Sequence, residues 1–170
     1  MLVFKKYTKT ELRQWMVSKA KTASGLRRRL VTNTDRNRDK TVLGKLYFFW
    51  YDPKHKDTLP VYDRFPLVFP IEPYSDGFLG LNLHYLSIVE RSALLNRLMV
   101  YTTSKTLNDQ TRLKLTYDTL ASTRALSSIA RPCIKRYLYG HVRSMYVEVT
   151  ADEWDKASQL PVELFVTNTR

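Results

Sequence analysis

The sequence predicts an α+β fold: a small antiparallel sheet packed with three to four helices, preceded by a basic, extended N-terminal arm. Short strand-like segments rich in aromatic residues follow one another between residues 44 and 83, and helical periodicity replaces them after residue 86. Of the 28 Lys and Arg residues, 13 lie in the first 45 positions. We therefore divide the chain of 170 residues into a basic helix and arm, residues 1–43, and a single α+β domain, residues 44–170.

In the N-terminal region, Thr8 and Glu11 have the spacing of a capping box, and apolar residues follow them at helical intervals. These features predict a helix from about Thr10 to Lys21, and Ser24 and Gly25 are expected to terminate it. The next segment, residues 26–40, is basic and rich in Asn and Thr, and it has neither helical nor strand periodicity. We expect it to be an extended arm or a segment that orders only on binding.

The first strands are predicted between turns that contain Gly, Pro and Asp. Four prolines within residues 60–73 exclude a helix there and favour edge strands or irregular packing. We expect Gly77 to supply a turn conformation and Gly80 to permit close packing of the backbone. The predicted strands are residues 44–51, 61–63, 66–71 and 78–83.

Two polar residues at the end of the last of these strands are interpreted as serving the fold. Asn82 and His84 lie two residues apart, so strand alternation puts them on one face. There we expect them to hydrogen-bond the loop that carries Asp63 or Glu72.

Helical periodicity begins near Ser87, and two further pairs have capping-box spacing, Ser87 with Glu90 and Thr150 with Glu153. Pro132 suits the first turn of another helix. The predicted elements are helices at residues 87–103, 111–122 and 132–142, a strand at residues 145–149, and a short helix that ends near residue 161.

The positive charge is concentrated at the N-terminal end of the chain. Residues 1–45 carry +10 of the net charge of +12, so the rest of the chain is nearly neutral. This asymmetry is typical of proteins that contact nucleic acid or an acidic partner, and Arg suits bidentate contacts with phosphate or carboxylate. The nucleic-acid-binding residues predicted in the arm are Arg27, Arg28, Arg29, Arg36, Arg38 and Lys40.

A second basic group extends over residues 112–143, where Asp118 is the single acid; its members are Arg112, Lys114, Arg124, Arg131, Lys135, Arg136 and Arg143. The spacing of Lys135, Tyr139 and Arg143 puts them on one helix face, which we expect to follow a track of phosphates. The alternative is a solvated face that later acidic residues balance. Lys135, Arg136 and Arg143 complete the predicted set of nucleic-acid contacts.

Several classes of site find no support in the sequence. The single cysteine, Cys133, excludes an intramolecular disulfide and a cysteine-based zinc site, and it suits a reducing cytoplasm. Phosphate-binding glycine motifs and apolar runs long enough to span a membrane are absent from the sequence. We therefore expect no enzyme activity, no cofactor, no metal and no membrane partner.

A catalytic alternative is a metal-dependent nuclease built from Asp52, Asp63 and Glu72. We expect no cleavage of DNA from it.

Residues 46–86 contain an ordered series of motifs: an aromatic strand, then YDPKHKDTLP, YDRFPL and GFLGLNLHYL. Further pieces follow in order, TRL at 111–113, PCIKRYL at 132–138 and EWD at 153–155. Over residues 44–166 this series resembles a pattern of T-even-type myoviruses and their cyanophage relatives, and it leaves the basic arm outside. By this resemblance, the chain is identified as a member of the phage DNA end protector family.

The resemblance implies a head-completion virion protein that binds the terminus of packaged double-stranded DNA and shields it from host exonuclease. It carries over no catalytic residue, and its implied partners are DNA and other phage head, neck or tail proteins, in a virion assembled in the host cytoplasm. Ser87 and Ile88 depart from the pattern, because the family usually has prolines there. A second interpretation stays open: a structural neck, tail or baseplate connector whose basic arm threads into a neighbouring virion protein.

Overall fold

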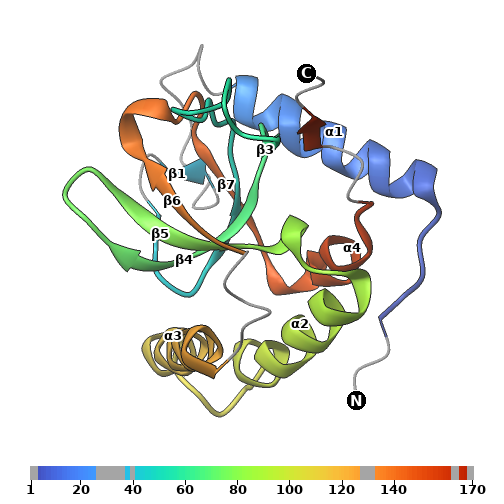
Figure 1. The fold of residues 1–170 in the computed structure, drawn as a ribbon. Coiled ribbons are helices and arrows are strands. Elements are labelled where there is room, and N and C mark those ends of the chain that lie inside the picture. Colours follow the sequence, from blue (N-terminus) through green and yellow to red (C-terminus); the bar gives the residue numbers. More distant parts are fainter. Residues whose placement is uncertain (1–3, 26–36, 39–40, 127–132, 162–164, 168–170) are drawn as a thin grey trace.

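The computed structural model describes residues 4–25, 37–38, 41–126, 133–161 and 165–167 (Figure 1). Within these residues, helices and antiparallel strands pack into an α+β fold, which confirms the predicted fold class. The α-helices are α1 (Lys9–Gly25), α2 (Ile88–Thr102), α3 (Asp109–Leu126) and α4 (Trp154–Gln159). The strands are β1 (Asn37–Arg38), β2 (Leu46–Phe48), β3 (Val61–Asp63), β4 (Leu67–Pro73), β5 (Gly77–Asn82), β6 (Ile134–Leu138), β7 (Tyr146–Val149) and β8 (Phe165–Thr167). Short 3₁₀ helices are η1 (Leu83–Tyr85), η3 (Tyr139–His141) and η4 (Ala151–Glu153).

The main sheet has its strands in the order β1-β7-β2-β4-β5-β6, and every neighbouring pair is antiparallel. The sheet is strongly curved (Figure 1), and η3 returns the chain from β6 to the segment that follows β2. There the Asp52 N–H donates to the His141 carbonyl over 2.9 Å, and the Arg143 N–H donates to the Trp50 carbonyl over 2.8 Å. Strands β3 and β8 form a separate antiparallel pair.

Side chains alternate along residues 46–49, so this segment contributes to two hydrophobic cores on opposite faces of the sheet. Leu46 and Phe48 are buried in the core that includes residues of all four helices. Tyr47 and Phe49 are buried in a second cluster that consists almost entirely of aromatic rings. The members of this aromatic cluster are Tyr47, Phe49, Tyr51, Val68, Phe78, Tyr137 and Tyr146.

Helix α1 is part of the first core, although it lies in the basic N-terminal region. It packs beside β7 and α4 (Figure 1), and Leu12 and Trp15 are buried there. Trp15 Nε1 donates to Glu153 Oε1 over 3.2 Å, and the Lys19 ammonium lies 2.6 Å from the same carboxylate. Helix α1 therefore shares a hydrophobic core with the domain predicted at residues 44–170.

The helices other than the one at residues 132–142, and all predicted strands, are confirmed within small shifts of their ends. The capping boxes explain where the helices begin. The Glu11 N–H donates to Thr8 Oγ1 over 3.2 Å, and the Ser87 N–H donates to the Glu90 carboxylate over 2.7 Å. The third box is also present, because the Thr150 N–H donates to Glu153 Oε2 over 3.2 Å.

The helix predicted at residues 132–142 is wrong, because residues 134–138 form strand β6. This strand pairs with β5, with Lys135 opposite Gly80 and Tyr137 opposite Phe78. Tyr137 enters the aromatic cluster, so the burial of one ring on a sheet face overrides a sequence spacing that also suits a helix.

The expectations about Pro and Gly residues are confirmed in part. Strand β4 contains Pro70 and is not an edge strand, because it lies between β2 and β5. The alternative, irregular packing, is confirmed by a register shift between Pro70 and Glu72 that accommodates the proline. Gly77 closes a turn in which the Tyr74 N–H donates to its carbonyl over 2.8 Å, but it is also the first residue of β5 and lacks the turn conformation expected of glycine. Among the described glycines, Gly44 is the one with positive φ, at 84°. A Cβ atom at Gly77 would lie 1.9 Å from the Tyr137 carbonyl oxygen, and one at Gly80 would lie 2.2 Å from Val68 Cγ1. Both glycines thus permit close packing, as predicted for Gly80.

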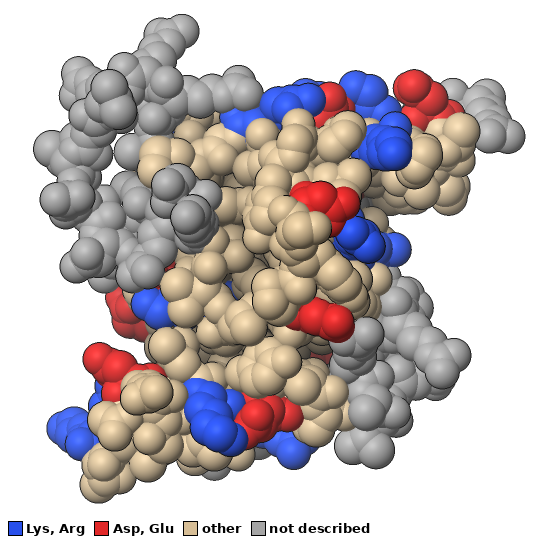
Figure 2. Space-filling view, turned by 90° about the vertical axis from the view of Figure 1, so that its left-hand side faces the viewer, with Lys and Arg blue, Asp and Glu red and all other residues tan. Residues whose placement is uncertain are grey.

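Charges on the described surface are mixed. On the face drawn in Figure 2, lysine and arginine side chains lie interspersed with aspartate and glutamate, and uncharged residues separate them. On this face, the described residues form no extended patch of one sign. This agrees with the near-neutral charge of the sequence beyond residue 45.

Candidate nucleic-acid interface

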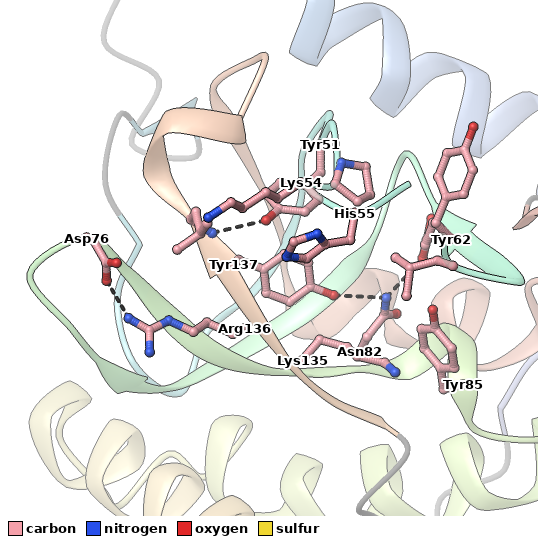
Figure 3. A pocket seen from close by; sticks show the side chains of 14 residues that line it. Tyr51, Lys54, His55, Tyr62, Asp76, Asn82, Tyr85, Lys135, Arg136 and Tyr137 are labelled. Carbon is pink, nitrogen blue, oxygen red and sulfur yellow. Dashed lines mark hydrogen bonds and ion pairs between the residues drawn. The ribbon is translucent and has the colours of Figure 1, made fainter. Parts of the chain in front are cut away.

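A pocket of about 500 Å³ lies between residues 51–63, which follow β2, and strand β6 (Figure 3). Its lining combines tyrosine rings with cationic side chains, the two kinds of group with which proteins bind single-stranded nucleic acid. The tyrosines are Tyr51, Tyr62, Tyr85 and Tyr137, and the basic residues are Lys54, His55, Lys135 and Arg136.

The floor of the pocket is a buried hydrogen-bond network centred on Asp63. Its carboxylate accepts from the Phe65 N–H over 3.1 Å and from Asn82 Nδ2 over 3.0 Å, and it lies 2.6 Å from His84 Nδ1. Asn82 Nδ2 also donates to the Tyr137 hydroxyl over 3.1 Å. The predicted role of Asn82 and His84 in binding the loop at Asp63 is confirmed. Because these groups bind one another, the network supports the pocket rather than presenting a reactive group.

Strand β6 forms one wall of the pocket, and its two basic residues have different partners. The Lys135 ammonium lies 4.5 Å from the ring centroid of Tyr85. The Arg136 guanidinium lies 2.6 Å from Asp76 and 4.5 Å from the ring centroid of Tyr74. Burial raises the pKa of Tyr85 to about 12, so its hydroxyl stays protonated at neutral pH.

The opposite wall is the segment at residues 51–63, a loop followed by strand β3, and hydrogen bonds attach it to β6 and η3. The Leu138 N–H donates to the Tyr51 hydroxyl over 3.1 Å, and His141 Nδ1 lies 2.8 Å from the Asp52 carbonyl. Within the loop, the Thr58 N–H donates to the His55 carbonyl over 3.0 Å. These bonds present Lys54 and His55 on an ordered loop at the pocket.

The pocket has more positive than negative charge available to a ligand. The carboxylates in its lining are Asp63 and Asp76, which already interact with His84 and Arg136. Among the described residues, neither Lys54 nor Lys135 forms an ion pair, and Lys54 is exposed. An anionic ligand therefore meets two ammonium groups that no carboxylate neutralises at contact distance.

The predicted arm residues are almost entirely outside the described part of the chain. Arg27, Arg28, Arg29, Arg36 and Lys40 lie outside it. Arg38 lies in β1, where its backbone pairs opposite Tyr146 of β7, and its side chain is not among those described.

The second basic group is only partly brought together. Lys135 and Arg136 line the pocket, but the predicted helical stripe of Lys135, Tyr139 and Arg143 does not exist, because these residues lie in β6, in η3 and after η3. Arg143 instead donates to the Gly140 carbonyl over 2.8 Å, and its Nη2 lies 3.7 Å from Asp52.

The sequence interpretation missed Lys54, His55, Tyr62 and Tyr85 as candidates. The motif YDPKHKD indicates Lys54 and His55 as candidates, because they directly follow a turn at Asp52-Pro53. Nothing local in the sequence links that turn to β6, because only the curvature of the sheet brings them together.

The acids of the nuclease alternative do not gather into a site. A hydrogen bond from Lys56, 2.8 Å away, lowers the pKa of Asp52, while Asp63 is buried in the network of the floor. Across the residues that the structure describes, no group of three or more His, Cys, Asp and Glu side chains is arranged to hold a metal ion. Likewise, none of the described helices is both long and apolar enough to cross a membrane.

Comparison with known proteins identifies the family. Residues 4–170 match the family described as the phage T4 terminal DNA protecting protein. The match includes the basic N-terminal region, which the motif resemblance over residues 44–166 left out. No curated protein and no solved structure matches the chain. Since the match covers nearly the whole sequence, the chain belongs to the phage T4 terminal DNA protecting protein family.

Proposed function

We propose that this protein binds the terminus of packaged double-stranded phage DNA and shields it from exonuclease. The observation that carries the proposal is the family match over residues 4–170, since the family is described by the protection of terminal DNA. The cationic N-terminal region and the tyrosine-lined cationic pocket supply surfaces with the chemistry that DNA binding requires.

The basic segment supplies the affinity in this proposal. Its arginines contact backbone phosphates, release counterions and hold the duplex without reading its sequence. The proposed contacts are Arg27, Arg28, Arg29, Arg36, Arg38 and Lys40 in the arm, with Lys135, Arg136 and Arg143 in the body. Protection then comes from occupying the terminus, and no bond in the DNA is made or broken.

We further propose that the protein acts in the virion, beside other head, neck or tail proteins. A packaged terminus has to be held within the particle, so a protein that covers it has neighbours there. A purely structural connector would share this position, but it would show little affinity for DNA and no preference for ends.

The decisive experiment compares two nucleases on the same linear duplex. The full-length protein is titrated against DNA and challenged with an exonuclease that starts at ends or with an endonuclease that cuts internally. We expect protection from the exonuclease alone, with a midpoint that follows the concentration of DNA ends and not that of base pairs. Equal protection from both enzymes would indicate general coating of DNA, and no protection would reject the proposal.

A further inference from the structure

We infer that the pocket between residues 51–63 and strand β6 binds the unpaired terminal nucleotide of a DNA strand. Lys135 holds its phosphate at the end of the pocket where Tyr62 and Tyr85 contact its base, and Lys54, toward the other end, contacts the phosphate of the adjoining nucleotide (Figure 3). This inference deepens the proposed function and rests on it, because it names the part of the DNA that the protein recognises at an end.

The size of the pocket fits one nucleotide. Its volume of about 500 Å³ is within the range of roughly 300–1,000 Å³ that small-molecule sites occupy. A paired end would bring two sugar-phosphate backbones to the opening, whereas one extruded or overhanging nucleotide enters alone. Enzymes that act on single bases use the same arrangement, a pocket that accepts a nucleotide taken out of the stack.

The charges in the pocket favour a phosphate. Lys54 on the loop and Lys135 on β6 line the same pocket from opposite walls, and neither forms an ion pair among the described residues. Arg136 is less available, since its guanidinium lies 2.6 Å from Asp76. Each ammonium group can therefore bind a phosphate of the terminal segment without displacing a carboxylate.

Two of the four tyrosines are suited to contact a base. Tyr51 and Tyr137 are buried, and their hydroxyls already accept hydrogen bonds from Leu138 N–H and Asn82 Nδ2. Tyr62 and Tyr85 are half-buried and come from different segments at the same end of the pocket (Figure 3). Aromatic rings stack on any of the four bases. The Lys135 ammonium lies 4.5 Å from the ring centroid of Tyr85, so a base that contacts Tyr85 has its phosphate close to this cation.

The pocket offers little means of reading the identity of that base. The side chain best suited to base edges is Asn82, but its amide nitrogen donates to Asp63 and Tyr137 and its oxygen accepts from the His84 N–H over 2.9 Å. The recognition inferred here is therefore independent of sequence and directed at the presence of an end.

The test measures the preference of the full-length protein for DNA ends. Two duplexes of equal length are compared, one closed by a hairpin loop at a single end and one closed at both ends. We expect the wild-type protein to bind the duplex with an open end more tightly. A single unpaired nucleotide at that end should raise affinity further, by about tenfold or more, because no base pair has to open.

The pocket variants are Lys54→Gln combined with Lys135→Gln, and separately Tyr62→Leu. We expect each to lower affinity for the open end by roughly 5- to 100-fold, since stacking and two phosphate contacts are lost, while binding to the fully closed duplex changes little. Tyr62→Phe keeps the ring and should keep the preference. Lys56→Gln is the matched control, because Lys56 lies in the same loop, pairs with Asp52 and does not line the pocket.

The outcomes separate this inference from the proposed function. Pocket variants that fold like the wild type and keep its full preference for open ends would overturn the pocket and leave end protection intact. A wild-type protein that binds closed and open duplexes equally would overturn both. Thermal unfolding of each variant establishes that its fold is retained. The preference of Lys54→Gln alone for open ends is a second measurement, and because Lys54 is exposed, it does not depend on buried groups.

Discussion

At the scale of single residues, Asp63 joins segments that are far apart in the sequence. It ends strand β3, and its carboxylate binds the backbone of Phe65 and the side chains of Asn82 and His84. A buried carboxylate is tolerable only when hydrogen bonds replace its lost hydration, and this network provides them. The end of β3 is thereby held against the end of β5, and these bonds form the floor of the pocket.

We predict that His84→Ala lowers the free energy of unfolding by roughly 1–3 kcal/mol, because it removes one partner of the buried Asp63 carboxylate. The measurement is urea denaturation of the full-length protein. His55→Ala is the control, since His55 is exposed and we expect a change within about 0.5 kcal/mol. A His84→Ala protein of unchanged stability that no longer protects DNA ends would contradict a structural role for this histidine.

A second residue-scale prediction concerns the glycines of β5. Gly77→Ala would place a Cβ atom 1.9 Å from the Tyr137 carbonyl oxygen, so strands β5 and β6 have to separate. We expect a loss of stability of about 1–3 kcal/mol or more, typical of overpacking. Gly140→Ala, whose Cβ would meet nothing within 4 Å, should leave stability nearly unchanged. Equal melting temperatures for the two variants would contradict the close approach of β5 and β6.

At the scale of elements, α1 shows how a charged segment of the chain also serves the core. Trp15 packs edge-on against Phe48 of β2, with ring centroids 5.6 Å apart, and Trp50 Nε1 donates to the Ala20 carbonyl over 3.3 Å. The apolar face of the helix therefore packs against the sheet. Its basic side chains lie on the exposed face, except Lys19, which forms an ion pair with Glu153 just before α4.

We predict that Trp15→Ala lowers the free energy of unfolding by roughly 3–5 kcal/mol, as expected for truncating a large buried aromatic side chain. Val17→Ala on the same helix is the matched control. Its side chain is 48% exposed, and we expect a change within about 0.5 kcal/mol. Chemical denaturation measures both. If Trp15→Ala proved as stable as Val17→Ala, α1 would not be part of the core in solution.

The elements that the sequence predicts well are those with local signals. Capping boxes at Thr8 and Ser87 mark the starts of α1 and α2, and aromatic segments between turns mark β2 to β5. Strand β6 was missed because Ile134, Tyr137 and Leu138 also fit a helical spacing. Its true partner is β5, more than fifty residues earlier, and a local period holds no information about such pairing.

The candidate site was harder to predict than the fold. Lys135 and Arg136 were singled out for their charge, and they do line the pocket, but on a strand rather than a helix. Lys54 belongs to a loop that reads as a turn between strands, and Tyr62 lies in the short strand β3 that follows this loop. Only the return of the chain through η3 brings that loop against β6, and this contact depends on the curvature of the whole sheet.

At the scale of the whole molecule, the net positive charge is concentrated in one part of the chain. The described body carries mixed charges (Figure 2), whereas residues 1–45 hold most of the net charge. In the proposed function the two parts have different tasks. The basic segment holds DNA of any sequence through its phosphates, and the body confines the protein to a terminus.

We predict that DNA binding depends steeply on salt, with a log–log slope of about −4 to −7 for five to eight phosphate contacts. Replacing Arg27, Arg28 and Arg29 together with Gln should make the slope less negative by about 3. The measurement is fluorescence anisotropy of a labelled linear duplex over a series of salt concentrations.

The control for this experiment removes the same charge elsewhere. Arg97, Lys105 and Lys114 are exposed on or between α2 and α3, and their combined replacement by Gln should leave the salt slope nearly unchanged. An equal effect of both triple variants would show that net charge, rather than the N-terminal segment, governs affinity. A wild-type slope near zero would reject phosphate contact as the basis of binding.

The pairing of β1 with β7 fixes the N-terminal region to the main sheet at a second point. Helix α1, which ends at Gly25, contacts β7, and Asn37 and Arg38 pair opposite Val147 and Tyr146 of the same strand. Strand β1 is also the edge strand of the sheet. In the proposed function, DNA that the basic segment binds is therefore brought to this edge of the body.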